Sequence, residues 1–280
     1  MGKFKYFLLT KSLGFYLNVL VYLFPKKAQA MSYKLFSTPR KGKLNINQLP
    51  QFLKSHVSEQ LVYTNYTIQT YTWVGTSDVI LLVHGWESNS TRWKKVLPHL
   101  LKTGKTIVAI DAPAHGLTSG SEFNVPFYTE IIQVAIAKFK PVTIIGHSIG
   151  GAATIYNQYK YPSVHVKKIV LLGTPDEISI ILKNYIALLS LNVKNEKLFI
   201  DYFETNFKVH IPTFSGSNFA KSSTVKTLIV HDINDDVVLF DEGKKLAAAF
   251  KNSVFVKTEG LGHSLHDATV YKKIVAFIND

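Results

Sequence analysis

Short runs of β-branched and other apolar residues recur along the chain from about residue 60 onward. Residues 61–74 alternate Tyr, Thr, Val and Ile, which is typical of antiparallel strands. The later runs are apolar throughout, and this predicts strands that are buried on both faces of a parallel sheet. These runs lie at Val79–Val83, Thr106–Ile110, Val142–Ile145, Lys168–Leu172, Thr227–Val230 and Val254–Lys257.

Helical patterns fill most of the intervals between the predicted strands. The spacing of apolar residues predicts helices over about 90–103, 126–139, 149–160, 241–250 and 266–278. Regular alternation of strand and helix predicts a layered α/β fold, with a mostly parallel central sheet flanked by helices.

The interval between Pro175 and Lys226 breaks this alternation, because it contains no strand pattern. It holds two apolar helical stretches, Ile178–Leu191 and Glu196–Phe207, followed by a loop. We therefore predict a helical cap inserted at about 176–225, since insertions of this kind in α/β folds often cover a site. Its apolar residues would suit an apolar pocket, or they would simply pack the cap onto the body.

The N-terminal segment has a different pattern. Leu13–Phe24 is apolar apart from one Asn, and on a helix Lys11, Gly14 and Asn18 would form one narrow stripe. Four interpretations remain open: a helix in a membrane interface, a cleaved signal peptide, a transmembrane span, or a helix packed on the body. Residues 31–58 are interpreted as a polar linker, so we predict an arm at 1–58 and a catalytic domain at 59–280.

Composition and charge narrow the classes of protein. The 280 residues are 46% hydrophobic, which excludes wholesale disorder. The absence of Cys excludes a disulfide scaffold, a cysteine nucleophile and a thiolate zinc site. The formal net charge is +13, and residues 1–58 hold ten basic residues and no acidic one.

The basic arm predicts an anionic partner near the N-terminus. A membrane surface is favoured over nucleic acid, because the basic residues accompany an apolar run and the chain has only two arginines, Arg40 and Arg92. We expect no nucleic-acid partner, and a cytoplasmic protein held peripherally at the membrane through residues 1–58. A signal peptide is the alternative.

The strongest local motif is Gly146-His147-Ser148-Ile149-Gly150-Gly151, which follows one predicted strand and opens a predicted helix. A Ser on a sharp strand-to-helix turn projects out of the sheet, and its strained backbone requires Gly on both sides. The amide end of the following helix favours developing negative charge. The motif therefore predicts Ser148 as a nucleophile, supported by Gly146 and Gly150.

A hydroxyl nucleophile requires a base, and the base requires an acid that orients it. His263 lies in a Gly-rich loop after the last predicted strand, at the same carboxyl edge as Ser148. His266 is the competing base. The spacing of His263, His266 and Asp267 would also suit a metal, but no further acid–histidine cluster supports one, so we expect no metal and no cofactor.

The acid is expected in the loop after Thr227–Val230, where Asp232, Asp235 and Asp236 compete. Spacing alone does not separate these carboxylates.

The oxyanion of an acyl-transfer reaction requires two backbone donors. We expect the amide of Ile149, directly after the nucleophile, and the amide of Trp86, in the loop after the first parallel strand. Gly85 would allow the close approach of this loop.

Together these residues resemble the α/β-hydrolase superfamily in its serine esterase and lipase branch. The order Ser148, Asp235, His263 is the family's own, and the resemblance covers roughly residues 60–280. It favours Asp235, because the family places its acid about four residues after a strand-end His-Gly. Here that pair reads His231-Asp232, and this departure keeps Asp236 as the alternative acid.

The resemblance also covers the loop that precedes the elbow. Asp111 and His115 look like the family's structural loop near the site and are expected to support it, and His147 is expected to be structural.

The resemblance implies a serine hydrolase that cleaves a small-molecule carboxylic ester through an acyl-enzyme. The apolar cap and arm suggest lipid-like or medium-chain acyl groups. The same residues would also serve an amidase, a thioesterase, an acyltransferase, a lyase or a perhydrolase. A non-catalytic membrane-associated module on the same fold is the alternative from another class.

Overall fold

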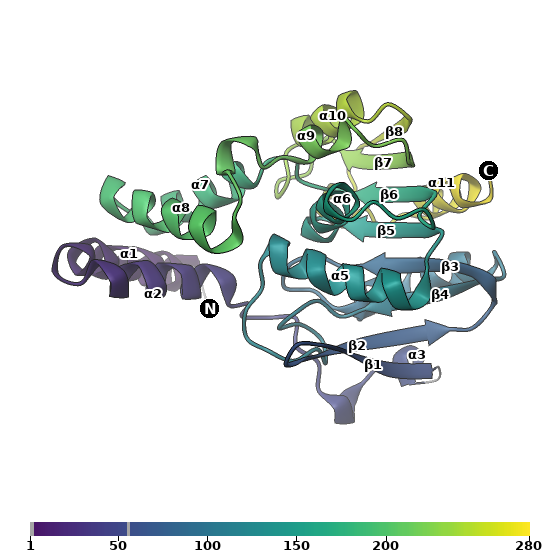
Figure 1. Cartoon of the computed structure of the whole chain (residues 1–280), viewed down its shortest axis with the longest axis horizontal. Helices are drawn as coiled ribbons and strands as arrows, with labels where there is room; N and C mark the ends of the chain where they lie inside the picture. The colour runs from purple at the N-terminus through teal and green to yellow at the C-terminus, as the bar shows by residue number, and fades with distance from the viewer. Residues whose placement is uncertain (1–2, 55–56) are drawn as a thin grey trace. The chain divides into compact units, whose positions relative to one another are not determined.

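The computed structural model describes residues 3–54 and 57–280 (Figure 1). Within these residues, eight strands form one sheet in the order β1-β2-β4-β3-β5-β6-β7-β8. The strands are β1 (Val57–Tyr63), β2 (Tyr66–Trp73), β3 (Thr76–Val83), β4 (Lys105–Ile110), β5 (Thr143–His147), β6 (Lys168–Leu172), β7 (Lys226–Asp232) and β8 (Ser253–Thr258).

Strands β3 to β8 run parallel, and β1 and β2 form an antiparallel hairpin that joins the sheet through β4. The prediction of a mostly parallel sheet is confirmed, and each predicted apolar run falls within or overlaps an observed strand. Parallel register places Val83 opposite both Ile110 and Gly146, so the strands that lead into the predicted site loops end side by side.

Helices cover both faces of the sheet, as the strand–helix alternation predicts. One face carries α4 (Leu97–Leu101) and α11 (Ala268–Asn279), which share a buried apolar cluster with side chains of the sheet such as Leu82 and Val230. Helices α5 (Val125–Phe139) and α6 (Ile149–Lys160) pack side by side over the sheet in Figure 1, and α10 (Phe240–Ala249) contacts β7 and β8.

The single helix predicted over about 90–103 is wrong. The chain instead forms a 3₁₀ turn, Ser90–Lys94, and then the short α4. Pro98 stands in the first turn of α4. Because Pro lacks an amide hydrogen, it can begin a helix but cannot continue one.

A second compact unit consists of residues up to Thr38 together with Glu177–Ser215. It contains α1 (Lys3–Leu23), α2 (Pro25–Ser37), α7 (Ile178–Leu189) and α8 (Val193–Phe207). Its core is rich in aromatic residues: Tyr33 contacts Phe203, with ring centroids 5.5 Å apart, and Phe36 contacts Phe199 at 5.4 Å.

The boundaries of the two units differ from the predicted ones. The larger unit is Pro39–Asp176 with Gly216–Asp280, so the inserted segment is Glu177–Ser215, and the short helix α9 (Gly216–Ala220) belongs to the body. Residues 31–37 are helical rather than linker, because apolar side chains recur in them and contact α8.

Residues 39–54 also belong to the body rather than to the arm. The amide of Leu44 donates to the carbonyl of Gly116, 3.0 Å, and Leu53 is buried. The predicted division at 58 and 59 therefore falls inside β1.

Candidate active site

Ser148 occupies a sharp turn between β5 and α6. Its φ is 52° and its ψ is −130°, a combination that normally only Gly adopts. The flanking positions have no room for a side chain, because a Cβ at Gly146 would lie 2.6 Å from the Cα of Gly151, and one at Gly150 would overlap the carbonyl of His84. The turn thus holds Ser148 out of the sheet, partly exposed, at the start of α6.

His263 and Asp235 are joined by a hydrogen bond of 2.8 Å between Nδ1 and Oδ2. Because Nδ1 donates to the carboxylate, Nε2 of a neutral His263 carries the free lone pair that a general base requires. The carboxylate is held by the amides of Val237 and Val238, which both donate to Oδ1 at 2.9 Å.

The pKa of Asp235 lies below its ordinary value. Burial alone would raise the pKa of this carboxyl, but the hydrogen bond from His263 and the two amides outweigh burial and lower it. Asp235 is therefore ionised at neutral pH.

The loop that carries His263 is bonded directly to the turn at Ser148. His147, the residue before Ser148, donates from Nε2 to the carbonyl of His263 at 3.0 Å, and the two rings lie 4.8 Å apart. The amide of Ser148 in turn donates to the carbonyl of Leu172 at 2.8 Å.

Gly173, which follows β6 at this edge, is not among the site residues predicted from the sequence. Its φ is 52°, and a Cβ there would lie 3.2 Å from Nδ1 of His263 and 3.3 Å from Oδ2 of Asp235. The available signal was a Gly at the end of an apolar strand run, next in the sheet to the strand of the elbow.

The competing acid and base lie apart from this arrangement. Asp236 is exposed and makes no hydrogen bond or ion pair with the part of the chain that the structure describes. His266 is engaged elsewhere, since its Nδ1 forms a hydrogen bond of 2.8 Å with the hydroxyl of Tyr271 in α11. Asp232 is buried and accepts from Thr258 and from the amide of Leu261.

The two expected oxyanion donors lie beside the turn at Ser148. Gly85 brings the loop after β3 against Ser148, because a Cβ at Gly85 would lie 2.9 Å from the Cβ of Ser148. Among residues 3–54 and 57–280, neither the amide of Trp86 nor that of Ile149 donates a hydrogen bond to another group. Both amides are therefore available to a ligand.

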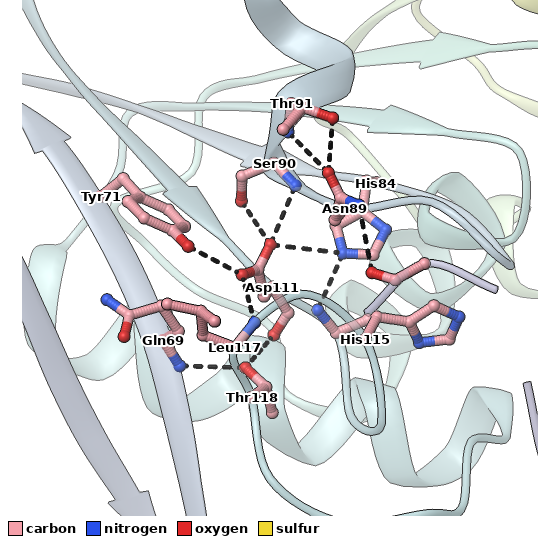
Figure 2. A network of polar contacts seen from close by, with 12 residues as sticks. Gln69, Tyr71, His84, Asn89, Ser90, Thr91, Asp111, His115, Leu117 and Thr118 are labelled. Carbon is pink, nitrogen blue, oxygen red and sulfur yellow. Dashed lines mark hydrogen bonds and ion pairs between the residues drawn. The ribbon is translucent and has the colours of Figure 1, made fainter. Parts of the chain in front are cut away.

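Asp111 organises the loops behind the site, as Figure 2 shows. It is fully buried and accepts from the Ser90 amide (2.8 Å), the Ser90 hydroxyl (2.7 Å), the Leu117 amide (3.0 Å) and the Tyr71 hydroxyl (3.1 Å). Burial raises the pKa of the Asp111 carboxyl, and the hydrogen bonds from these donors offset part of this rise.

Two neutral histidines, His84 and His115, fix the loop that carries Trp86. Nε2 of His84 accepts from the Ala112 amide at 2.9 Å, so its Nδ1 donates to the Gly85 carbonyl at 2.8 Å. Nε2 of His115 likewise accepts from the amide of Glu87 at 2.9 Å. Burial is the main cause that lowers the pKa of each histidine to about 4. The residues before and after Trp86 are thus both held by uncharged imidazoles.

Metal ligands do not cluster in the described residues, where no group of three or more His, Cys, Asp or Glu side chains could hold an ion.

Comparisons with known proteins agree with this fold. Residues 78–211 match the family model of the α/β hydrolase fold. A serine hydrolase-like protein of Danio rerio is 38% identical over 101 residues, 34% of this chain and 30% of its own length. A bifunctional esterase/perhydrolase of Acinetobacter calcoaceticus is 26% identical over 251 residues, 71% of this chain and 91% of its own.

Solved structures agree as well. Est1E from Butyrivibrio proteoclasticus, determined with ferulic acid bound, superimposes with a TM-score of 0.66 at 17% identity, over 79% of this chain and 98% of its own. The chain has the α/β-hydrolase fold, and it is similar in sequence to serine hydrolase-like proteins and to an esterase. It spans 30%, 32% and 49% of the lengths of the first three curated relatives.

Proposed function

We propose that this protein hydrolyses carboxylic esters, with Ser148 as nucleophile, His263 as general base and Asp235 as the acid that orients it. The observation that carries the proposal is the 2.8 Å hydrogen bond between Asp235 and Nδ1 of His263. It leaves Nε2 of His263 able to take a proton, and the backbone carbonyl of His263 is bonded to His147, the residue before the serine that the turn holds out of the sheet.

In the acylation half of the reaction, Nε2 of His263 takes the hydroxyl proton of Ser148 while the serine oxygen attacks the ester carbonyl carbon. The carbonyl oxygen becomes an oxyanion, which the amides of Trp86 and Ile149 stabilise. The tetrahedral species collapses, His263 gives its proton to the leaving alcohol, and an acyl-enzyme ester on Ser148 remains.

In the deacylation half, His263 takes a proton from water as the water oxygen attacks the acyl carbon. Collapse of the second tetrahedral species returns the proton to Ser148 and releases the carboxylic acid. Asp235 stays ionised throughout and stabilises the imidazolium form of His263, which is consistent with the lowered pKa of this carboxyl.

The acyl group is proposed to be lipid-like or of medium chain length. The apolar composition of Glu177–Ser215 and of α1 supports this choice. The prediction that the inserted helices cover the site stays a prediction.

The test is hydrolysis of p-nitrophenyl esters from acetate to palmitate, with labelling by a fluorophosphonate probe. Ser148→Ala should abolish both turnover and labelling, whereas Ser222→Ala, at an exposed serine outside the site, should leave both unchanged. The chain-length optimum then reports the acyl group.

Two results would contradict the proposal in different ways. Absence of both turnover and labelling at Ser148 would mean that the three residues do not work together. Labelling without turnover of any ester would leave the nucleophile intact and reject the ester substrate in favour of amides, thioesters or other acyl acceptors.

A further inference from the structure

Helix α1 carries a broad exposed apolar face, while Leu17, Leu20 and Val21 on its other side are buried. Eleven of the 22 exposed large hydrophobic side chains of the described chain lie between Phe4 and Phe24. They are Phe4, Tyr6, Phe7, Leu8, Leu9, Phe15, Tyr16, Val19, Tyr22, Leu23 and Phe24. Phe4 and Phe15 are each 72% exposed.

The polar stripe of α1 is used to hold the helix on the turn between α7 and α8. Nζ of Lys11 donates to the carbonyl of Leu188 at 3.0 Å and to the hydroxyl of Ser190 at 2.7 Å. This places a positive charge at the C-terminal end of α7, where a helix favours cations.

Asn18 and Gly14 complete this contact. The side chain of Asn18 donates to the carbonyl of Ser190 at 2.8 Å and accepts from the amide of Asn192 at 2.8 Å. Gly14 lies so close to the backbone of Leu189 that any Cβ would overlap its carbonyl. The orientation of α1 on this unit is therefore fixed by specific polar contacts, and its apolar face is directed away from them.

An exposed apolar face along a whole helix marks a surface that is covered by another body. The charged side chains near the helix indicate what kind of body covers this face. Lys5, Lys26, Lys27 and Lys34 are exposed, and the first acidic residue of the chain is Glu59. Apolar side chains flanked by lysines suit a bilayer with anionic headgroups.

A second copy of this chain is less suited to cover the apolar face of α1. Two such faces placed together would bring the two sets of lysines close, with no acidic side chain of the arm to neutralise them.

We propose that α1 lies in the plane of an anionic lipid bilayer and is the membrane-docking surface of this protein. Phe4–Leu23 is long and apolar enough to cross a membrane by length and composition. A crossing helix would draw Lys11, Asn18 and the α7–α8 turn bonded to them into the hydrocarbon, whereas a helix lying in the interface leaves these groups on its protein side. This docking does not depend on the proposed ester hydrolysis.

The first test uses the full chain and measures sedimentation with vesicles of phosphatidylcholine, with and without phosphatidylglycerol. The protein should bind the anionic vesicles more tightly, and added salt should weaken the difference. Exchange of Phe15 and Tyr22 for Gln should weaken binding by roughly a hundredfold or more, given the area that the two rings would bury. The matched control exchanges Val62 and Val74, which are 71% and 76% exposed on the body, for Gln.

A second pair of double variants tests how much the lysine charges contribute to vesicle binding. Lys26→Gln with Lys27→Gln should weaken binding to anionic vesicles by roughly tenfold or more, while Lys272→Gln with Lys273→Gln in α11 should have little effect. Circular dichroism would verify that every variant is folded.

Three outcomes would overturn the proposal. The first is no vesicle binding by the full chain, and the second is binding that the Phe15 and Tyr22 exchange does not change. The third is a dimer in light scattering that the same exchange dissociates, without any binding to lipid. Ser148→Ala should bind vesicles as the natural chain does, so failure of the proposed catalysis and failure of docking are separate results.

Discussion

The carboxylate of Asp232 accepts a hydrogen bond of 3.0 Å from the backbone amide of Leu261. This bond joins the last residue of β7, directly before the loop that carries Asp235, to the loop after β8, which carries His263. The same oxygen accepts from the hydroxyl of Thr258 at 2.7 Å, and the other oxygen accepts from the Asn234 amide at 3.0 Å. The Asp that stands where the family resemblance expects Gly thus links the two loops.

Asp232→Ala removes all three of these bonds and should act through the position of His263. Ester turnover should fall by roughly tenfold to a hundredfold, mainly in kcat, and the free energy of unfolding should fall by about 2 kcal/mol. Kinetics and urea unfolding measure the two effects. Asp236→Ala is the matched control and should leave both unchanged, and an equal loss in the control would remove the special role of Asp232.

Asp235→Asn should lower kcat by roughly a thousandfold to ten-thousandfold, because an amide neither holds His263 in the required tautomer nor stabilises its charged form. Asp236→Asn should have little effect, since this side chain is exposed. Steady-state kinetics on the best p-nitrophenyl ester decide between the two carboxylates. A larger loss of kcat in Asp236→Asn than in Asp235→Asn would show that Asp236 is the acid.

Ser148 should store backbone strain, since its φ of 52° and ψ of −130° suit Gly alone. Ser148→Gly removes the Cβ and should be more stable than Ser148→Ala by about 1–2 kcal/mol, although both variants should be inactive. Urea unfolding of the two variants measures this difference. At the exposed position 222, the control pair Ser222→Gly and Ser222→Ala is compared in the same way. Here the Gly variant should not be more stable than the Ala variant.

The strands and the nucleophile turn could be predicted because their signals are local. Buried parallel strands require continuous apolar runs, and the turn at Ser148 requires Gly at fixed spacing. The choice between Asp235 and Asp236 could not be predicted from spacing. It depends on the direction of the turn, which aims the Val237 and Val238 amides at Asp235.

The packing of the N-terminal arm also could not be predicted from the sequence pattern. The stripe of Lys11, Gly14 and Asn18 was visible, but its partner is the turn at Ser190, more than 170 residues away in the chain. Side-chain periodicity within one helix carries no information about such a distant partner.

Gly14→Ala should loosen α1 from the α7–α8 turn. Ala normally stabilises a helix interior relative to Gly by about 1 kcal/mol, but here the added methyl would overlap the carbonyl of Leu189. Hydrogen exchange at the amides of Leu191 and Asn192 should therefore become faster. Ser12→Ala, on the exposed side of α1, is the control, and equal protection in both variants would contradict the close approach.

The histidines behind the site should make the protein sensitive to acid. The pKa of His84 and of His115 is lowered from 6.5 to about 4, so between these values the unfolded chain binds protons that the folded chain does not. Stability present above about pH 6.5 is therefore lost as the pH falls toward about 4, on the order of 3 kcal/mol for one such histidine. The raised pKa of Asp111 acts in the opposite direction and offsets part of this loss.

Urea unfolding at a series of pH values measures this effect. His115→Gln should be less stable than the natural protein at neutral pH but should lose less stability on acidification, because the proton that His115 takes up on unfolding is gone. His165→Gln, at an exposed histidine, should keep the full dependence on pH. If His115→Gln lost as much stability on acidification as the natural protein, then protonation of His115 would not contribute to unfolding in acid.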